Sequence, residues 1–346
     1  MIIVYNGILS VIFFVCVIYR KCVLLQPKSL EMFKNKGKED KGFLLAEIAQ
    51  FVYAALTMLL ILFTWTNFQN PSGLLWERVT MVSGTIALWI VYRLWPSKII
   101  MLCRVGYLLL MLGHWYPDTY ELNKQFGSFD NVFAQYEQSL FGFQPAYVFS
   151  KAFPSAIFSE MMYAGYVSYY LFFVFTIFIV FVRDYKQLRH VTFMIITGFF
   201  LCYVIYIFMP VTGPQYYFYA IGEESVVAGN FQDIGKFFSE TQACLKAPGW
   251  KDGFFYGLNQ LAHQTGERPT AAFPSSHVAI ATLVMLIVTR MKMWKWLMIL
   301  AVPFVLLCLS TVYIQAHYAI DAIAGMIYGI LLFVILGGLK LRRCGG

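Results

Sequence analysis

The chain has 346 residues, of which 60% are hydrophobic, 18% aromatic and only 13% charged, and its mean hydropathy is +0.65. A soluble domain of this length could not bury so much apolar surface, so the composition excludes a soluble protein and predicts a polytopic membrane protein. The net charge of +8 does not indicate nucleic acid binding, because the basic residues stand in short loops between apolar segments. We expect an all-α fold, a helical bundle that spans the membrane.

Apolar runs of about 18 to 25 residues, long enough to cross roughly 30 Å of hydrocarbon, predict about nine membrane spans. We expect residues 1–97 to form accessory helices and residues 98–346 to form a catalytic transmembrane domain. The first run is not preceded by basic residues and has no small-residue cleavage site, which favours a retained helix over a removed signal peptide. The runs lie at residues 2–19, 43–66, 79–95, 98–115, 158–182, 191–209, 275–290, 294–313 and 318–339.

Lys and Arg are distributed unevenly between the two sides of this arrangement. About 18 of the 26 fall in short loops on one side, which predicts that this side is cytoplasmic. The outer segments 116–157 and 210–273 are too long for simple turns, so we expect functional caps, the first of them lying along the membrane interface. The outer side corresponds to the periplasm of a bacterium, which we favour, or to the Golgi lumen of a eukaryote.

The sequence indicates neither a cofactor nor a metal. Its seven cysteines show no paired spacing such as Cys-x-x-Cys, so neither a disulfide framework nor a zinc site is expected. Charged groups inside membrane spans are rare and generally need a partner. The sequence identifies no partner or role for the intramembrane residues Glu47, Arg104 and Glu160.

The first of two polar clusters opens an apolar run and reads Phe-Pro-Ser-Ser-His at residues 273–277. Proline and serine before such a run predict a helix start, with a serine N-cap and free backbone N–H groups that can bind an anion. We therefore expect Ser275 and Ser276 to contact the substrate and His277 to lie in the first helical turn. An ionisable side chain in a membrane helix indicates function.

The second polar cluster contains Ser310, Thr311, His317 and Asp321. Residues four apart share a helix face, so Asp321 is expected to hold one imidazole nitrogen of His317 and to leave the other free to attack. Ser310 lies two turns before His317 if the helix continues, and it is a candidate substrate-binding residue. Together the two clusters supply the nucleophile and the separate acid that phosphoryl transfer requires.

Each cluster alone also fits a structural role. Pro-Ser-Ser is often only a helix cap, and His-x-x-x-Asp is often only a satisfied polar pair. Their occurrence at the same depth, on the same predicted side of the membrane, favours a shared site. The spacing of Gly325 and Gly329 indicates close helix packing, which we interpret as structural.

The two clusters resemble the second and third motifs of the type-2 phosphatidic acid phosphatase superfamily, Pro-Ser-Gly-His and Ser-Arg-x5-His-x3-Asp. The matching positions are residues 274–277 and 310–321. The resemblance implies a six-helix core within the catalytic domain. It also implies that His317 becomes a phosphohistidine, that Asp321 orients it, and that His277 acts as general acid and then base, without a metal.

The departures from this family pattern concern basic residues. The first motif, Lys-x6-Arg-Pro, has no counterpart in residues 210–217, which contain no Lys or Arg, and Thr311 stands in place of the third-motif arginine. Arg268 is carried over only as a candidate phosphate contact, and Gln215 and Tyr216 are further substrate-binding candidates. Fewer cations suit a singly charged phosphodiester better than a doubly charged phosphomonoester.

The pattern Phe-Pro-Ser-x-His followed by His-Tyr-x-x-Asp is similar to the inositol phosphorylceramide synthase branch of this superfamily. The similarity implies an enzyme that moves phosphoinositol from a phospholipid donor to a lipid acceptor such as ceramide. The first alternative is a lipid or polyprenyl phosphate phosphatase of the same fold, and the second is a non-catalytic transporter or assembly protein. The sequence indicates no nucleic acid partner and does not determine the oligomeric state.

Overall fold

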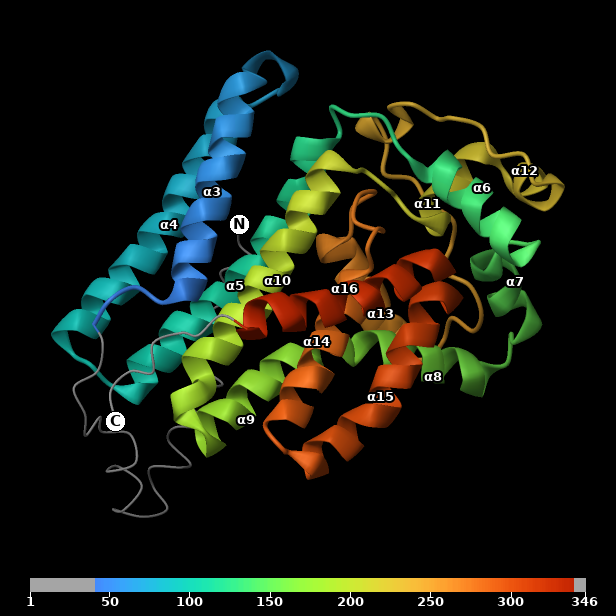
Figure 1. Cartoon of the computed structure of the whole chain (residues 1–346). Helices are drawn as coiled ribbons and strands as arrows, with labels where there is room; N and C mark the ends of the chain where they lie inside the picture. The colour runs from blue at the N-terminus through green and yellow to red at the C-terminus, as the bar shows by residue number, and fades with distance from the viewer. Residues whose placement is uncertain (1–40, 339–346) are drawn as a thin grey trace.

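The computed structural model describes residues 41–338, which form a bundle of helices without a β-strand (Figure 1). The predicted all-α fold class is confirmed, and the predicted span at residues 2–19 lies outside the described residues. The helices are α3 (Leu45–Phe63), α4 (Pro71–Leu94), α5 (Lys98–Asn123), α6 (Asp130–Phe141), α7 (Pro145–Ala152), α8 (Ala156–Val167), α9 (Thr176–Arg183), α10 (Leu188–Phe208), α11 (Pro214–Ile221), α12 (Glu223–Ala228), α13 (Phe254–Gly266), α14 (Ser276–Arg290), α15 (Trp294–Tyr313) and α16 (Ala319–Gly338).

Six segments of the described chain are long and apolar enough to cross a membrane by themselves, and they contain α3, α4, α5, α10, α15 and α16. Together, α8 and α9 form a seventh candidate, which bends by 47° between Val167 and Leu171, just before the π-helical segment Leu171–Phe175. The apolar α14 has 15 residues and is therefore only about 22 Å long. The resemblance implies a six-helix core. From Lys98 onward the long helical segments are six: α5, α8–α9, α10, α14, α15 and α16.

Buried ion pairs connect α3 and α4 to α5. Arg104 donates to both carboxylate oxygens of Glu47, at 2.8 and 2.6 Å, and thereby joins α5 to α3. Arg78 of α4 donates to Asp118 of α5 at 2.7 Å. Each pair neutralises charges that would be costly in hydrocarbon if left alone. The structure thus supplies the partner of Glu47 that the sequence could not identify.

The third residue for which the sequence identified no partner, Glu160 of α8, binds the N-terminus of a surface helix. Its carboxylate accepts the backbone N–H groups of Phe255 and Tyr256, each at 3.0 Å. Acceptors at a helix start satisfy donors that have no partner within the helix. Glu160 therefore holds α13 against α8.

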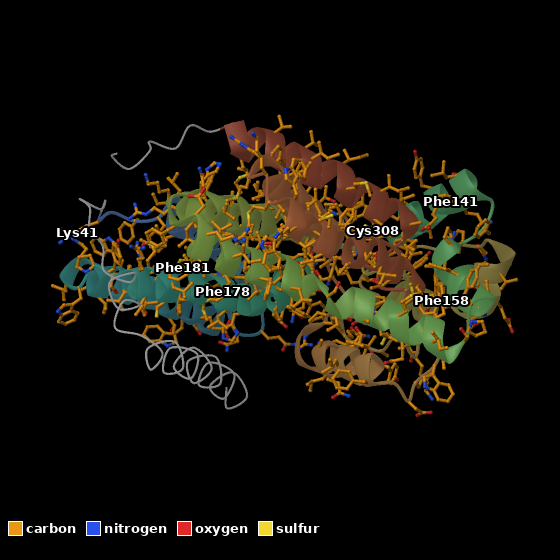
Figure 2. All side chains as sticks on the ribbon, turned by 90° about the horizontal axis from the view of Figure 1, so that it is seen from below. Lys41, Phe141, Phe158, Phe178, Phe181 and Cys308 are labelled. Carbon is orange, nitrogen blue, oxygen red and sulfur yellow. The ribbon has the colours of Figure 1, made fainter. Side chains whose placement is uncertain are left out.

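Four short helices of the two long connecting segments lie at one end of the bundle. Helices α6, α7, α11 and α12 lie there, beside the start of α16 (Figure 1). Figure 2 shows Phe141 and Phe158 at this end and Lys41 at the opposite end. The first connecting segment begins after Asn123 and not at residue 116, because α5 continues through Pro117. Trp115 before this proline and Asp118 after it are buried, and the packing of this part of α5 outweighs the lost backbone hydrogen bond.

Helices α14 and α16 approach closely at the predicted Gly-x-x-x-Gly spacing. A Cβ atom added at Gly325 would lie 2.6 Å from the carbonyl oxygen of Ser275. A Cβ atom at Gly329 would collide with the carbonyl oxygen of Ala279. The absence of side chains here lets α14, which carries His277, pack directly against α16.

We expect Gly329→Leu to lower the free energy of unfolding by about 1–3 kcal/mol, because the added side chain must push α14 away from α16. Thermal unfolding in detergent micelles measures this loss. Gly338→Leu is the matched control in the same helix, since a Cβ at Gly338 meets no neighbouring atom within 4 Å. Equal stability of the two variants would contradict the close packing described above.

Candidate active site

The two motif histidines lie together where α14, α15 and α16 meet. His277 occupies the first turn of α14, as predicted, and His317 stands in the turn between α15 and α16. The Nε2 atom of His317 is 3.5 Å from Nδ1 of His277, and the ring centroids are 5.6 Å apart. The fold thus brings two imidazoles, one from a helix and one from a turn, within reach of one reacting group.

A backbone carbonyl orients the ring of His317. Its Nδ1 lies 2.8 Å from the oxygen of Ala272, so Nδ1–H donates there and Nε2 keeps its lone pair toward His277. The Asp321 carboxylate is 3.9 Å from Nδ1, which exceeds hydrogen-bonding distance. This differs from the expected pairing along one helix, because His317 stands in the turn before α16 and not on that helix.

Asp321 instead shapes the turn that carries His317. Its Oδ2 accepts the backbone N–H of Tyr318 at 2.8 Å, as an acidic residue in the first turn of a helix commonly does. Glu137 of α6 accepts the next backbone N–H, that of Ala319, at 2.9 Å. Burial raises the pKa of Glu137 to about 7, although this hydrogen bond lowers it. Two buried carboxylates therefore fix the residues that directly follow His317.

A third buried carboxylate, Asp130 at the start of α6, links the same turn to the segment before α11. One of its oxygens accepts the N–H of Thr212 at 2.7 Å. The other accepts the N–H of Gly213 at 2.9 Å and the hydroxyl of Tyr318 at 3.1 Å. Asp130 thus holds three parts of the chain together at the end of the bundle where the histidines lie.

The effect of Asp130 reaches His317 through the backbone. Val211, next to the segment that Asp130 binds, accepts the N–H of Ala272 at 2.9 Å, and the Ala272 carbonyl orients the imidazole. The sequence did not point to Asp130, since an acidic residue at a helix start is common in a segment expected to lie along the interface. The acidic first turn of α6 was its only signal.

Aromatic rings and a serine cap set the position of His277. The Tyr166 ring stacks on its imidazole at a centroid distance of 4.6 Å, and the Tyr169 ring lies at 4.2 Å. Ser275 is the N-cap of α14, and its hydroxyl oxygen accepts the N–H of Val278, which confirms the predicted serine cap. The cap and the two rings leave His277 little freedom to turn.

A cleft beside the two histidines is lined by three of the predicted substrate-binding residues, Gln215, Tyr216 and Arg268. It is also lined by Glu267, which the sequence did not single out, because one acidic residue in a polar loop carries no distinctive pattern. The cleft therefore offers hydrogen-bond donors and acceptors as well as one guanidinium group.

The three predicted serines are not among the residues that line this cleft. Ser275 is engaged as the helix cap, and the backbone N–H of Ser276 donates to the Tyr206 hydroxyl at 3.0 Å. Ser310 is fully buried and donates to a carbonyl one turn earlier in α15. Because α15 ends before His317, Ser310 does not continue on the same helical face as that histidine.

The protonation state of His317 suits attack on phosphorus. Burial lowers its pKa to about 4, although the hydrogen bond to Ala272 raises it. The ring is therefore neutral near pH 7, and the Nε2 lone pair is available. Within residues 41–338, no group of three or more His, Cys, Asp and Glu side chains is arranged to hold a metal ion.

Comparison with known proteins identifies the family. The model of the PAP2 superfamily matches residues 132–335, which is more than half of the chain and includes both histidines. No curated protein and no solved structure matches the chain. Members of this superfamily are phosphatases or phosphotransferases. The chain is a multi-pass membrane protein that belongs to the PAP2 superfamily.

Proposed function

We propose that the protein is a lipid phosphotransferase that moves a phospho-headgroup, with phosphoinositol favoured, from a glycerophospholipid to a lipid alcohol such as ceramide. The observation that carries this proposal is the pairing of His317 with His277. One imidazole presents an unprotonated nitrogen, and the second ring lies 3.5 Å from that atom. A two-step transfer through a covalent intermediate needs a nucleophile and a proton-transferring group in this relation.

In the first step, Nε2 of His317 attacks the donor phosphorus, an N–P bond forms, and the P–O bond to diacylglycerol breaks. His277 gives its proton to the departing oxygen. In the second step, His277 takes the proton of the acceptor hydroxyl, whose oxygen bonds to phosphorus while the N–P bond breaks. The headgroup is thereby transferred, and both histidines return to their starting states. Neither a metal nor a cofactor takes part in the proposed reaction.

The charge of the cleft supports a phosphodiester substrate. Among the described residues that line it there is one guanidinium, that of Arg268, and one carboxylate, that of the preceding residue Glu267. Thr311, at the position of the third-motif arginine, is buried and its hydroxyl donates to the carbonyl of Cys308. A doubly charged phosphomonoester would find too few cationic groups here to balance its charge. A singly charged phosphodiester needs fewer such groups.

We also propose that the site opens to the outer side of the membrane, with the bacterial periplasm favoured. His317 lies two residues before Ala319, whose N–H donates to Glu137 of α6. Phe141, the last residue of α6, lies at the end of the bundle opposite Lys41 (Figure 2). Lys and Arg concentrate in the loops predicted to face the cytoplasm. A lipid headgroup and a lipid hydroxyl both reside at the membrane surface, where such a site can receive them.

The experiment uses purified protein in liposomes that contain phosphatidylinositol labelled at phosphorus, with and without ceramide. We expect labelled inositol phosphorylceramide only when ceramide is present, and no labelled orthophosphate. A parallel reaction with labelled phosphatidic acid tests the phosphatase alternative. Orthophosphate released from phosphatidic acid without an acceptor, at a rate above headgroup transfer, would identify a phosphatase instead.

A further inference from the structure

Glu267 places a carboxylate in the cleft that holds the two histidines. It directly follows α13, and its side chain is 18% exposed. In the part of the cleft formed by residues 41–338, it is the one acidic residue of the lining. A carboxylate beside a bound phosphate is repelled by it, so its presence needs a reason other than phosphate binding.

Neighbouring donors fix the direction of the Glu267 carboxylate without using its full capacity. The Tyr166 hydroxyl donates to Oε1 at 2.9 Å, and Gln215 Nε2 donates to Oε2 at 3.5 Å. His263 Nε2 lies 3.4 Å from Oε2. A carboxylate can accept about four hydrogen bonds, so it retains capacity for a ligand donor. It is therefore a prepared acceptor at the edge of the site.

The Glu267 carboxylate lies one side chain away from the reacting groups. Tyr166, which donates to it, stacks on the imidazole of His277 at 4.6 Å between centroids. A substrate whose phosphorus faces the histidines can therefore present its headgroup to this carboxylate. The same tyrosine couples the position of Glu267 to that of the proton-transferring ring.

The surrounding charges favour a hydroxyl over an ammonium group as the donor to Glu267. Arg268 lines the same cleft, and its positive charge offsets the carboxylate and disfavours a cationic headgroup. Gln215 adds an amide that can both donate and accept. Hydroxyl groups use such a mixture of donors and acceptors, and their bonds to a carboxylate are strong.

We propose that Glu267, assisted by Gln215, binds a hydroxyl group of the substrate and so selects a hydroxyl-bearing lipid over a cationic one. The inference rests on the proposed headgroup transfer. The hydroxyl belongs either to a polyol headgroup of the donor or to the acceptor lipid. Both present the same chemistry to the carboxylate, and the experiment below separates them.

The test compares the wild type with Glu267→Gln in liposomes that contain equal amounts of phosphatidylinositol and phosphatidylcholine. We expect kcat/KM for phosphatidylinositol to fall about 10- to 100-fold, since a hydrogen bond to a charged group is lost. The rate with phosphatidylcholine should change less than about threefold. Glu240→Gln is the matched control, because Glu240 is exposed and outside the cleft lining. An unchanged ratio between the two donors would overturn the headgroup assignment.

A second experiment, on the acceptor lipid, varies the ceramide concentration at a saturating donor concentration. If the loss in Glu267→Gln appears in KM for ceramide and the donor ratio is unchanged, the hydroxyl is that of the acceptor. If neither the donor ratio nor the ceramide KM changes, the inference is wrong while headgroup transfer by the wild type still stands.

A measurement of ligand binding tests the inference in a protein that cannot turn over the substrate. Glycerophosphoinositol and glycerophosphocholine are titrated into His317→Asn protein and into the same variant with Glu267→Gln added. We expect Glu267→Gln to weaken only glycerophosphoinositol binding, by about 10-fold or more. Equal weakening of both ligands, or none with either, would contradict headgroup selection by Glu267. Failure of the wild type to transfer any headgroup would instead count against the proposed function.

Discussion

His317→Asn is expected to lower the rate of headgroup transfer by at least about 10⁴-fold, because the side chain that forms the covalent intermediate is removed. Asparagine lacks the Nε2 atom that lies 3.5 Å from His277. Its amide can still donate to the Ala272 carbonyl, which His317 Nδ1 contacts at 2.8 Å. The turn before α16 should therefore keep its shape while the nucleophile is lost.

The measurement traps the intermediate from a donor labelled at phosphorus. The wild type should retain label in a form that is stable to alkali and released by acid, as expected for an N–P bond, and His317→Asn should retain none. His114→Asn serves as the control, since His114 lies on α5 outside the cleft lining. A folded His317→Asn protein with more than one hundredth of the wild-type rate would show that this residue is not the nucleophile.

Asp130→Asn is expected to lower kcat about 100-fold and to change KM much less, because Asp130 positions the turn that carries the nucleophile and is not itself among the residues that line the cleft. Asp130 accepts from Thr212, Gly213 and Tyr318, so all its neighbours are donors. The amide of asparagine must point an N–H group at one of them. The segment before α11 and the turn after His317 then separate, although side-chain volume is conserved.

Two separate measurements distinguish positioning of His317 by Asp130 from a merely structural role of Asp130. Thermal unfolding reports the folded fraction, and the amplitude of labelled intermediate reports the number of competent sites. We expect a full amplitude that forms slowly, and a normal response from the exposed control Asp252→Asn. A reduced amplitude with an unchanged rate per competent site would mean that Asp130 supports folding and does not position His317.

The sequence predicted the elements of the fold well because each depends on neighbouring residues. A run of apolar residues must become a helix in hydrocarbon, where no water satisfies the backbone. The described spans accordingly appear as helices, although the one near residues 158–182 is broken just before a π-helical segment. The cap at Ser275 and the close packing at Gly325 follow from local chemistry in the same way. The inositol phosphorylceramide synthase-like specificity remains a proposal.

What the sequence determined alone is the helical membrane bundle, the superfamily and the two histidines, since these are recorded in run lengths and short motifs. The tertiary structure decided what holds the histidines: the carbonyl of Ala272 orients His317, while Asp321 caps the following helix. It also placed Asp130 and Glu267 beside the site. A backbone oxygen is present at every residue and carries no pattern in the sequence, and a carboxylate acquires its role only from the distant donors that folding brings to it.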